Sequence, residues 1–148
     1  MFKLHPRLTQ DTMVVGDFPL CRLLLMNDAN YPWFILVPRR TEVREIFELD
    51  DQDQKQLLKE SSHLSHVLNK IFQADKLNIA ALGNMVPQLH VHHIVRYHTD
   101  QAWPNPIWGL FPAQPYTERA LQETCACLID HLIDFTPDDN CAVPPRVC

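Results

Sequence analysis

Features that would define several other classes of protein are missing from this sequence of 148 residues. No apolar run approaches the 18 or so residues needed to cross a bilayer, and residues 1–7 lack the continuous hydrophobic region of a signal peptide. The chain also has no internal repeat and no low-complexity tract. We therefore expect a cytoplasmic protein without a membrane partner.

A cysteine framework and a basic surface are missing as well. The five cysteines are odd in number and form no Cys-x-x-Cys motif, so we expect reduced thiols that mostly fill the core. The net charge is −5 and the Lys and Arg residues are scattered, which disfavours a nucleic acid polymer as partner. A small phosphorylated ligand needs only a local pocket of donors, and the charge does not oppose it.

What the sequence does contain is typical of one globular domain. The apolar share of 46% and the charged share of 21% argue against disorder, and a chain of this length can build one core. We expect a single domain over residues 1–148. Its proline-containing tail, residues 136–148, is expected to be irregular and loose.

Strand-like and helical patterns predict an α+β fold. The expected strands cover residues 12–15, 20–26, 33–37, 77–82 and 89–97, and Gly83-Asn84 reads as a tight turn between the last two. Residues 51–72 predict the main helix, with Asp50 as its N-cap, and residues 117–135 predict a second helix. The expected architecture is a five-stranded antiparallel sheet with the main helix packed on it and an additional C-terminal helix.

Gln88, directly before the last expected strand, and His90 and His92 within it stand at alternate positions. Because side chains alternate between the faces of a strand, these three share one face, whereas His93 points to the other. Neighbours on one face lie about 6.5–7 Å apart, close enough for all three to meet one phosphate group. Neutral imidazole is a good nucleophile near pH 7, since its ordinary pKa is about 6.5. His90 could therefore attack phosphorus and form a covalent phosphohistidine.

The segment Gln88-Leu89-His90-Val91-His92-His93-Ile94 resembles the signature of the histidine-triad (HIT) superfamily, His-φ-His-φ-His-φ-φ with φ apolar. Upstream, Trp33-Phe34-Ile35-Leu36-Val37-Pro38-Arg39 is similar to a strand of that family that ends in an apolar-Pro-basic sequence. The resemblance covers residues 12–97. It implies a HIT-like fold, a homodimer, no obligatory metal or other cofactor, and hydrolysis or nucleotidyl transfer at the α-phosphate of a nucleotide conjugate. Dinucleoside polyphosphates and nucleoside phosphoramidates are the substrate classes implied.

The resemblance also implies roles for single residues. His90 matches the middle, nucleophilic position, and His92 matches the third position, which contacts the phosphate or the leaving group. Asn84 and the adjacent Met85 are expected near the nucleotide phosphate, and Asn27 resembles the polar residue that meets the ribose.

Gln88 departs from the signature because it stands where the family has its first histidine. A carboxamide can donate and accept hydrogen bonds but cannot transfer a proton near neutral pH. General-acid help to the leaving group is therefore not expected from this position. A shifted register, with His90 first, His92 in the middle and Ile94 third, would move Arg96 away from its usual place after the motif, so we prefer the first register.

Other interpretations of these residues stay open. A nucleotide-binding protein with little turnover fits Gln88, and a metal-dependent enzyme fits the His-x-His pair, although the Glu that the similar cupin motif wants is missing after His92. The aromatic residues Trp103, Trp108 and Phe111 could stack on a nucleobase or cover a sheet edge. The basic pair Arg39-Arg40 could steer a polyphosphate or form a solvated turn.

Overall fold

The strands of this protein form one antiparallel sheet in the order β4-β5-β3-β2-β1-β6. The computed structural model describes residues 1–141, and its strands are β1 (Thr12–Asp17), β2 (Cys21–Met26), β3 (Trp33–Pro38), β4 (Lys76–Ala80), β5 (Val91–Arg96) and β6 (Thr136–Pro137). The α+β fold class with an antiparallel sheet is therefore confirmed. The two-residue strand β6 adds a sixth strand to the five expected ones, beside β1.

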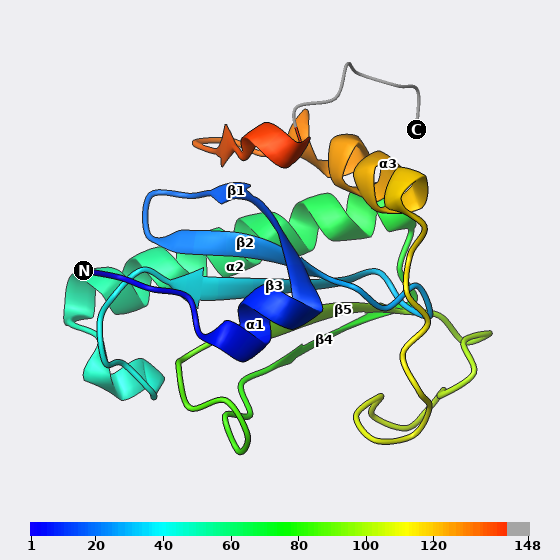
Figure 1. The fold of residues 1–148 in the computed structure, drawn as a ribbon, viewed down its shortest axis with the longest axis horizontal. Helices are drawn as coiled ribbons and strands as arrows, with labels where there is room; N and C mark the ends of the chain where they lie inside the picture. Colours follow the sequence, from blue (N-terminus) through cyan, green and yellow to red (C-terminus); the bar gives the residue numbers. More distant parts are fainter. Residues whose placement is uncertain (142–148) are drawn as a thin grey trace.

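Helices cover both faces of the sheet. The long helix α2 (Asp51–Phe72) lies behind the sheet in Figure 1, near α3 (Glu118–Ile129), whereas the short helix α1 (Pro6–Asp11) lies in front of it. Two single-turn helices, η1 (Ile46–Glu48) and η2 (Asp139–Cys141), are also present. No helix within residues 1–141 is long and apolar enough to span a bilayer.

The helix α2 has the bounds that the sequence predicts. Its N-cap is Asp50, whose side chain accepts a hydrogen bond from the backbone N–H of Asp53 at 2.8 Å. It ends at Gln73, which takes the left-handed conformation with φ 50° and donates its N–H to the carbonyl of Asn69. Local capping therefore fixes both ends of this helix.

Each face of the sheet buries its own set of apolar side chains, because successive residues of a strand point to opposite faces. The α2 face includes Leu23, Leu25, Phe34, Leu36, Leu64, Leu68, Val91 and Val95. The α1 face includes Leu8, Leu24, Trp33, Ile35, Val37, Ile94, Ala102 and Ile107. The central strands are consequently buried on both sides, and histidines on alternate positions of β5 meet two different surroundings.

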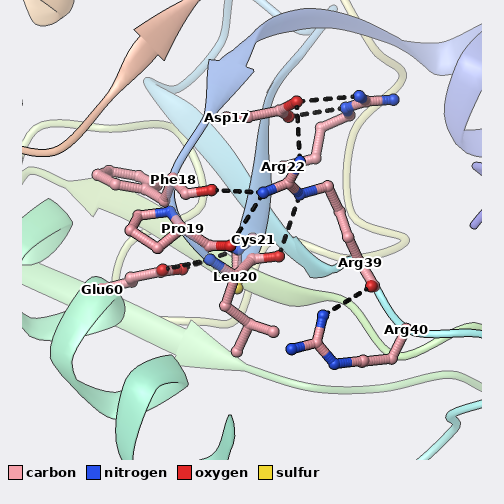
Figure 2. A network of polar contacts seen from close by, with 9 residues as sticks. All are labelled: Asp17, Phe18, Pro19, Leu20, Cys21, Arg22, Arg39, Arg40 and Glu60. Atoms are coloured by element: carbon pink, nitrogen blue, oxygen red, sulfur yellow. Dashed lines mark hydrogen bonds and ion pairs between the residues drawn. The ribbon is translucent and has the colours of Figure 1, made fainter.

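A polar network fastens the turn between β1 and β2 to the rest of the fold (Figure 2). The buried carboxylate of Glu60 on α2 accepts hydrogen bonds from the backbone N–H groups of Leu20 and Cys21, at 2.7 and 2.9 Å. The guanidinium of Arg39 donates to three carbonyls of the same turn. Arg40 pairs with the carboxylate of Asp53 on α2. Both arginines are thus used to hold the fold together.

The connection between β4 and β5 differs from the prediction. We expected a tight turn at Gly83-Asn84, but residues 81–90 form a long loop between the two strands. Pro87 has no N–H to give to a strand ladder, which limits how far the pairing can extend toward the turn. As a result Gln88 lies in the loop, and His90 immediately precedes β5 rather than lying within it.

The C-terminal segment also differs from the prediction. Helix α3 ends at Ile129 and not at residue 135, because the chain turns back and places Thr136–Pro137 against β1. Gly16 of β1 makes this pairing possible, since a Cβ there would overlap the carbonyl oxygen of Thr136 and the ring of Phe135. The first part of the expected loose tail is therefore ordered, and the remainder, residues 142–148, lies outside the described residues.

The prediction of reduced thiols is wrong for Cys125, Cys127 and Cys141, which are disulfide-bonded. Cys125 of α3 and Cys141 of η2 form a disulfide, which joins the end of the described chain to α3. Their separation in the sequence gives no local motif, and an odd total of cysteines does not exclude a bonded pair. Cys21 is a buried free thiol and fills the core as expected.

Candidate active site

Two histidine rings lie side by side where the loop 81–90 enters β5. The ring centroids of His90 and His92 are 4.9 Å apart, and the ring planes are inclined at 72°. Both side chains line a cavity of about 360 Å³ on the α1 face of the sheet. Asn84 and Met85 line the same cavity. The structure thus brings together four of the six residues predicted for the site.

The tautomer of His90 follows from its hydrogen bond to the backbone. Its Nδ1 lies 2.6 Å from the carbonyl oxygen of Gln88. A carbonyl oxygen only accepts hydrogen bonds, so Nδ1 carries the proton and donates it. Nε2 then holds the lone pair, and it has no hydrogen-bond partner within residues 1–141. This is the state in which an imidazole can act as a nucleophile.

The tautomer of His92 is the opposite one. The indole Nε1 of Trp33 lies 2.9 Å from Nδ1 of His92, and an indole N–H can only donate. His92 therefore accepts at Nδ1 and carries its proton on Nε2. Burial, together with the neighbouring rings of His90 and His93, lowers the pKa of His92 to about 3. The ring is neutral at physiological pH and offers one N–H donor.

A second cavity of about 430 Å³ adjoins the first. The two cavities share five lining residues, which are Arg7, Asp11, Met26, Trp33 and Trp108. Asn27 lines the second cavity, where its Oδ1 accepts a hydrogen bond from the backbone N–H of Tyr116 at 2.9 Å. The cleft therefore extends from the histidine pair toward Asn27, past an aromatic wall.

Gln88 lies outside both cavities. Its Oε1 accepts a hydrogen bond from the backbone N–H of His5 at 2.9 Å, and its Nε2 donates to the carbonyl of Lys3 at 2.9 Å. Both ends of the carboxamide are thus bound to the N-terminal segment that leads into α1. The side chain of Gln88 thus holds the N-terminal segment in place, and the backbone carbonyl of Gln88 contacts His90.

His93 lies on the other face of the sheet, as the strand alternation predicts. Its Nδ1 donates to the carbonyl of Val91 at 3.0 Å, and its Nε2 accepts from the hydroxyl of Ser61 on α2 at 2.7 Å. The side chain is fully buried, and this burial lowers its pKa to about 4. His93 therefore joins α2 to the sheet and takes no part in the cleft.

Several lining residues were not found by sequence reasoning. Arg7, Leu8 and Asp11 come from α1, which is too short to show a helical period, although His5 followed by Pro6 at the first helical position is a start signal. Arg7 and Asp11 form an ion pair at 3.2 Å.

Two aromatic residues also required the structure. Trp33 shares a face with His92 because Ile35, two residues along β3, is the partner of His92 in the sheet. That pairing cannot be read from one strand alone. Trp108 and Phe111 line the cleft, whereas Trp103 packs with Arg96 and His98 away from it.

A metal site has no ligand set in the described part of the chain. Within residues 1–141 no group of three or more His, Cys, Asp or Glu side chains is arranged to hold a metal ion. His90 and His92 each use Nδ1 in a hydrogen bond, and no carboxylate or thiolate completes the pair.

Comparisons with known proteins place this fold in a family. The HIT domain family model matches residues 7–99. A histidine triad protein from Marinobacter aquaeolei VT8 is 55% identical, with a TM-score of 0.87 and coverage of 89% of this chain and 96% of that chain. Histidine triad proteins from Bradyrhizobium japonicum and Sinorhizobium meliloti 1021 are 48% and 42% identical, with TM-scores of 0.86 and 0.87. They cover 88% and 89% of this chain and 97% and 98% of their own chains. No curated protein matches the sequence. The chain belongs to the HIT domain family.

Proposed function

We propose that this protein is a HIT-type hydrolase or nucleotidyl transferase that acts at the α-phosphate of a nucleotide conjugate. The observation that carries the proposal is the hydrogen bond from Nδ1 of His90 to the carbonyl of Gln88, because it leaves the lone pair on Nε2. A nucleophile so prepared attacks phosphorus and forms a phosphohistidine, which splits one displacement into two steps. His90 also lines a cavity of suitable size for a small ligand.

The other residues of the cleft have supporting roles in this proposal. His92 donates from Nε2 to an oxygen of the phosphate or of the leaving group, and Asn84 and Met85 contact the nucleotide near the same phosphate. Such donors stabilise the charge that develops on the phosphate oxygens. Asn27 lies farther along the cleft, where the ribose is expected, and Trp108 offers an aromatic face to the base.

The proposal is tested by trapping the intermediate. Diadenosine tetraphosphate labelled at the α-phosphorus is mixed with the protein, and the reaction is quenched with alkali, which preserves phosphohistidine. We expect acid-labile label on the wild type and none on His90→Ala. The matched control is His66→Ala, which removes an exposed histidine of α2 and is expected to keep the label. Full turnover by His90→Ala would contradict the proposal.

A second candidate function is nucleotide binding with little turnover. Gln88 favours it, because the first triad position is bound to the N-terminal backbone and offers nothing to the substrate. This alternative predicts nucleotide affinity by calorimetry without release of product and without label on His90. The homodimer and the cytoplasmic location implied by the sequence stay predictions.

A further inference from the structure

The first triad position supplies no proton to the cleft. The two polar atoms of the Gln88 side chain are both bound to backbone groups of Lys3 and His5, and the residue lines neither part of the cleft. A carboxamide does not exchange protons near neutral pH in any case. A general acid must therefore come from another residue if the reaction uses one.

The third triad position is held neutral by its neighbour. To act as an acid, His92 would have to bind a second proton at Nδ1, but the indole N–H of Trp33 points at that atom from 2.9 Å. Two donors would then face each other in a buried place, where an unsatisfied donor is costly. The low pKa of His92, which burial causes, agrees with this geometry. His92 can donate a hydrogen bond from Nε2 but has no proton to give away.

The remaining ionisable groups of the histidine cavity do not replace this acid. The titratable residues that line it are Arg7, Asp11, His90 and His92. Arg7 and Asp11 form an ion pair at 3.2 Å, in which the guanidinium donates to the carboxylate. His90 is the nucleophile. The cavity thus contains hydrogen-bond donors and the Arg7–Asp11 ion pair, but no group poised to transfer a proton.

From this arrangement we infer that the site accepts substrates whose leaving group departs as an anion, namely phosphoric anhydrides, and discriminates against phosphoramidates, whose amine must gain a proton. The inference rests on the proposed function and narrows its substrate class. Nε2 of His90 forms a bond to the α-phosphorus as the bond to the bridging oxygen breaks, and that electron pair leaves with the phosphate group. Water then attacks phosphorus, the electron pair returns to Nε2, and the water proton passes to solvent.

The leaving group sets the difference between the two substrate classes. A departing phosphate carries its charge as an anion, which Arg7 and the Nε2–H of His92 can stabilise. A departing amine would leave as an amide anion unless a proton reached the nitrogen. General-acid catalysis is worth about 10²–10⁴-fold in rate, so its absence penalises phosphoramidates by at least about 100-fold.

The test compares three substrates that share an adenosine 5′-phosphoryl group. Diadenosine tetraphosphate and adenosine 5′-(p-nitrophenyl phosphate) release anions, whereas an adenosine 5′-(N-alkyl)phosphoramidate releases an amine. We expect kcat/KM at pH 7 to be at least about 100-fold higher for the first two than for the third. A phosphoramidate within tenfold of the anhydride would overturn the inference. So would a nitrophenyl ester as slow as the phosphoramidate, because polyphosphate recognition would then explain the preference.

Failure of the proposed function would give a different result. In that case no substrate would be cleaved and no label would appear on His90, which overturns both conclusions together. Turnover of all three substrates at similar rates, with label on His90, overturns only the inference.

A pair of tryptophan variants tests the origin of the preference. Trp33→Phe removes the indole donor that faces Nδ1 of His92, so that this atom can bind a proton as the pH is lowered, and we expect the ratio of anhydride to phosphoramidate kcat/KM to fall at least about tenfold. Trp108→Phe removes the other indole of the cavity and leaves the hydrogen bond from Trp33 to His92 intact. We expect it to change kcat/KM by the same factor for both substrates. An unchanged ratio in Trp33→Phe, with both substrates still cleaved, would overturn the role of Trp33.

Discussion

His90 and His93 share one local geometry and have different uses. Each donates from Nδ1 to the carbonyl of the residue two positions earlier, at 2.6 and 3.0 Å, and each therefore holds its lone pair on Nε2. In His93 that lone pair accepts a hydrogen bond from Ser61, whereas in His90 it has no partner within residues 1–141. A backbone hydrogen bond alone does not make a nucleophile. What matters is whether the opposite ring nitrogen faces a helix or a cavity.

The two faces of the sheet explain why these surroundings differ. The face of His93 is closed by α2, which supplies both an apolar stripe and the hydroxyl of Ser61. The face of His90 is covered by the short helix α1 and by two loops, which leave a cleft. A regular helix fills its face more completely than irregular segments do, so the cleft lies on the irregular side.

The largest expected effect separates the two histidines. His90→Ala should lower turnover at least about 10³-fold, because no other group in the cavity can replace the nucleophile. His93→Phe should keep most turnover but lower the free energy of unfolding by about 1–3 kcal/mol, since the Ser61 hydroxyl and the Val91 carbonyl lose their buried partner. Steady-state kinetics and urea unfolding measure both. Equal loss of activity in the two variants would remove the distinction.

The next effect is a dependence of stability on pH. Burial lowers the pKa values of His92 and His93 to about 3 and about 4, below the ordinary 6.5 of an unfolded chain. Between the folded pKa values and 6.5 the unfolded state binds more protons than the folded state. The free energy of unfolding therefore has its full value above pH 6.5 and falls as the pH drops toward 4. Between pH 7 and pH 5 the titration of each histidine should lower the free energy of unfolding by about 2 kcal/mol.

Urea unfolding of the wild type and of His93→Phe at several pH values checks this. Carboxylates titrate in both proteins, so the difference between the two curves isolates His93. The difference in unfolding free energy should shrink by about 2 kcal/mol between pH 7 and 5. Parallel curves would show that His93 is not held neutral in the fold.

The smallest effect concerns Gln88. Its backbone carbonyl accepts a hydrogen bond from His90, and its side chain binds the N-terminal segment. Gln88→Glu keeps an acceptor for the N–H of His5 but loses the donor to the carbonyl of Lys3. A lost hydrogen bond of about 1 kcal/mol should loosen the segment before α1 and raise KM about fivefold, with kcat nearly unchanged. Hydrogen exchange of residues 3–11 should rise as well.

The control for this variant is Gln52→Glu, which makes the same chemical change at an exposed position of α2 and should leave KM and exchange unaltered. If Gln88→Glu lowered kcat at constant KM, Gln88 would act on the chemical step and not through the N-terminal segment.

Local signals in the sequence were sufficient for the parts of the fold that depend on local interactions. The helix α2 was predicted with both of its ends, because an N-cap and a regular apolar stripe act within one or two turns. The face of His93 followed from strand alternation alone. Interactions between distant segments were missed, namely the pairing of β6 with β1 and the disulfide between Cys125 and Cys141.

The same distinction holds for the site. His90 and His92 are two residues apart in one segment, so their proximity was predictable. The partners that decide their chemistry come from elsewhere in the chain: Trp33 from β3 for His92, and the N-terminal segment for Gln88. The sequence therefore predicted four of the residues that line the histidine cavity, but the tautomer of His92 depends on a contact across 59 positions.

The bond between Trp33 and His92 also has a spectroscopic consequence. The chain contains three tryptophans and therefore gives three indole N–H signals in a proton–nitrogen correlation spectrum. Within residues 1–141, Trp33 is the tryptophan whose indole N–H donates a hydrogen bond to a histidine nitrogen. When a phosphate oxygen accepts a hydrogen bond from Nε2 of His92, the electron density at Nδ1 changes. The resonance of the Trp33 indole N–H, which is bonded to Nδ1, therefore shifts. The protein thus carries a native reporter on which ligand binding can be titrated without an attached probe group.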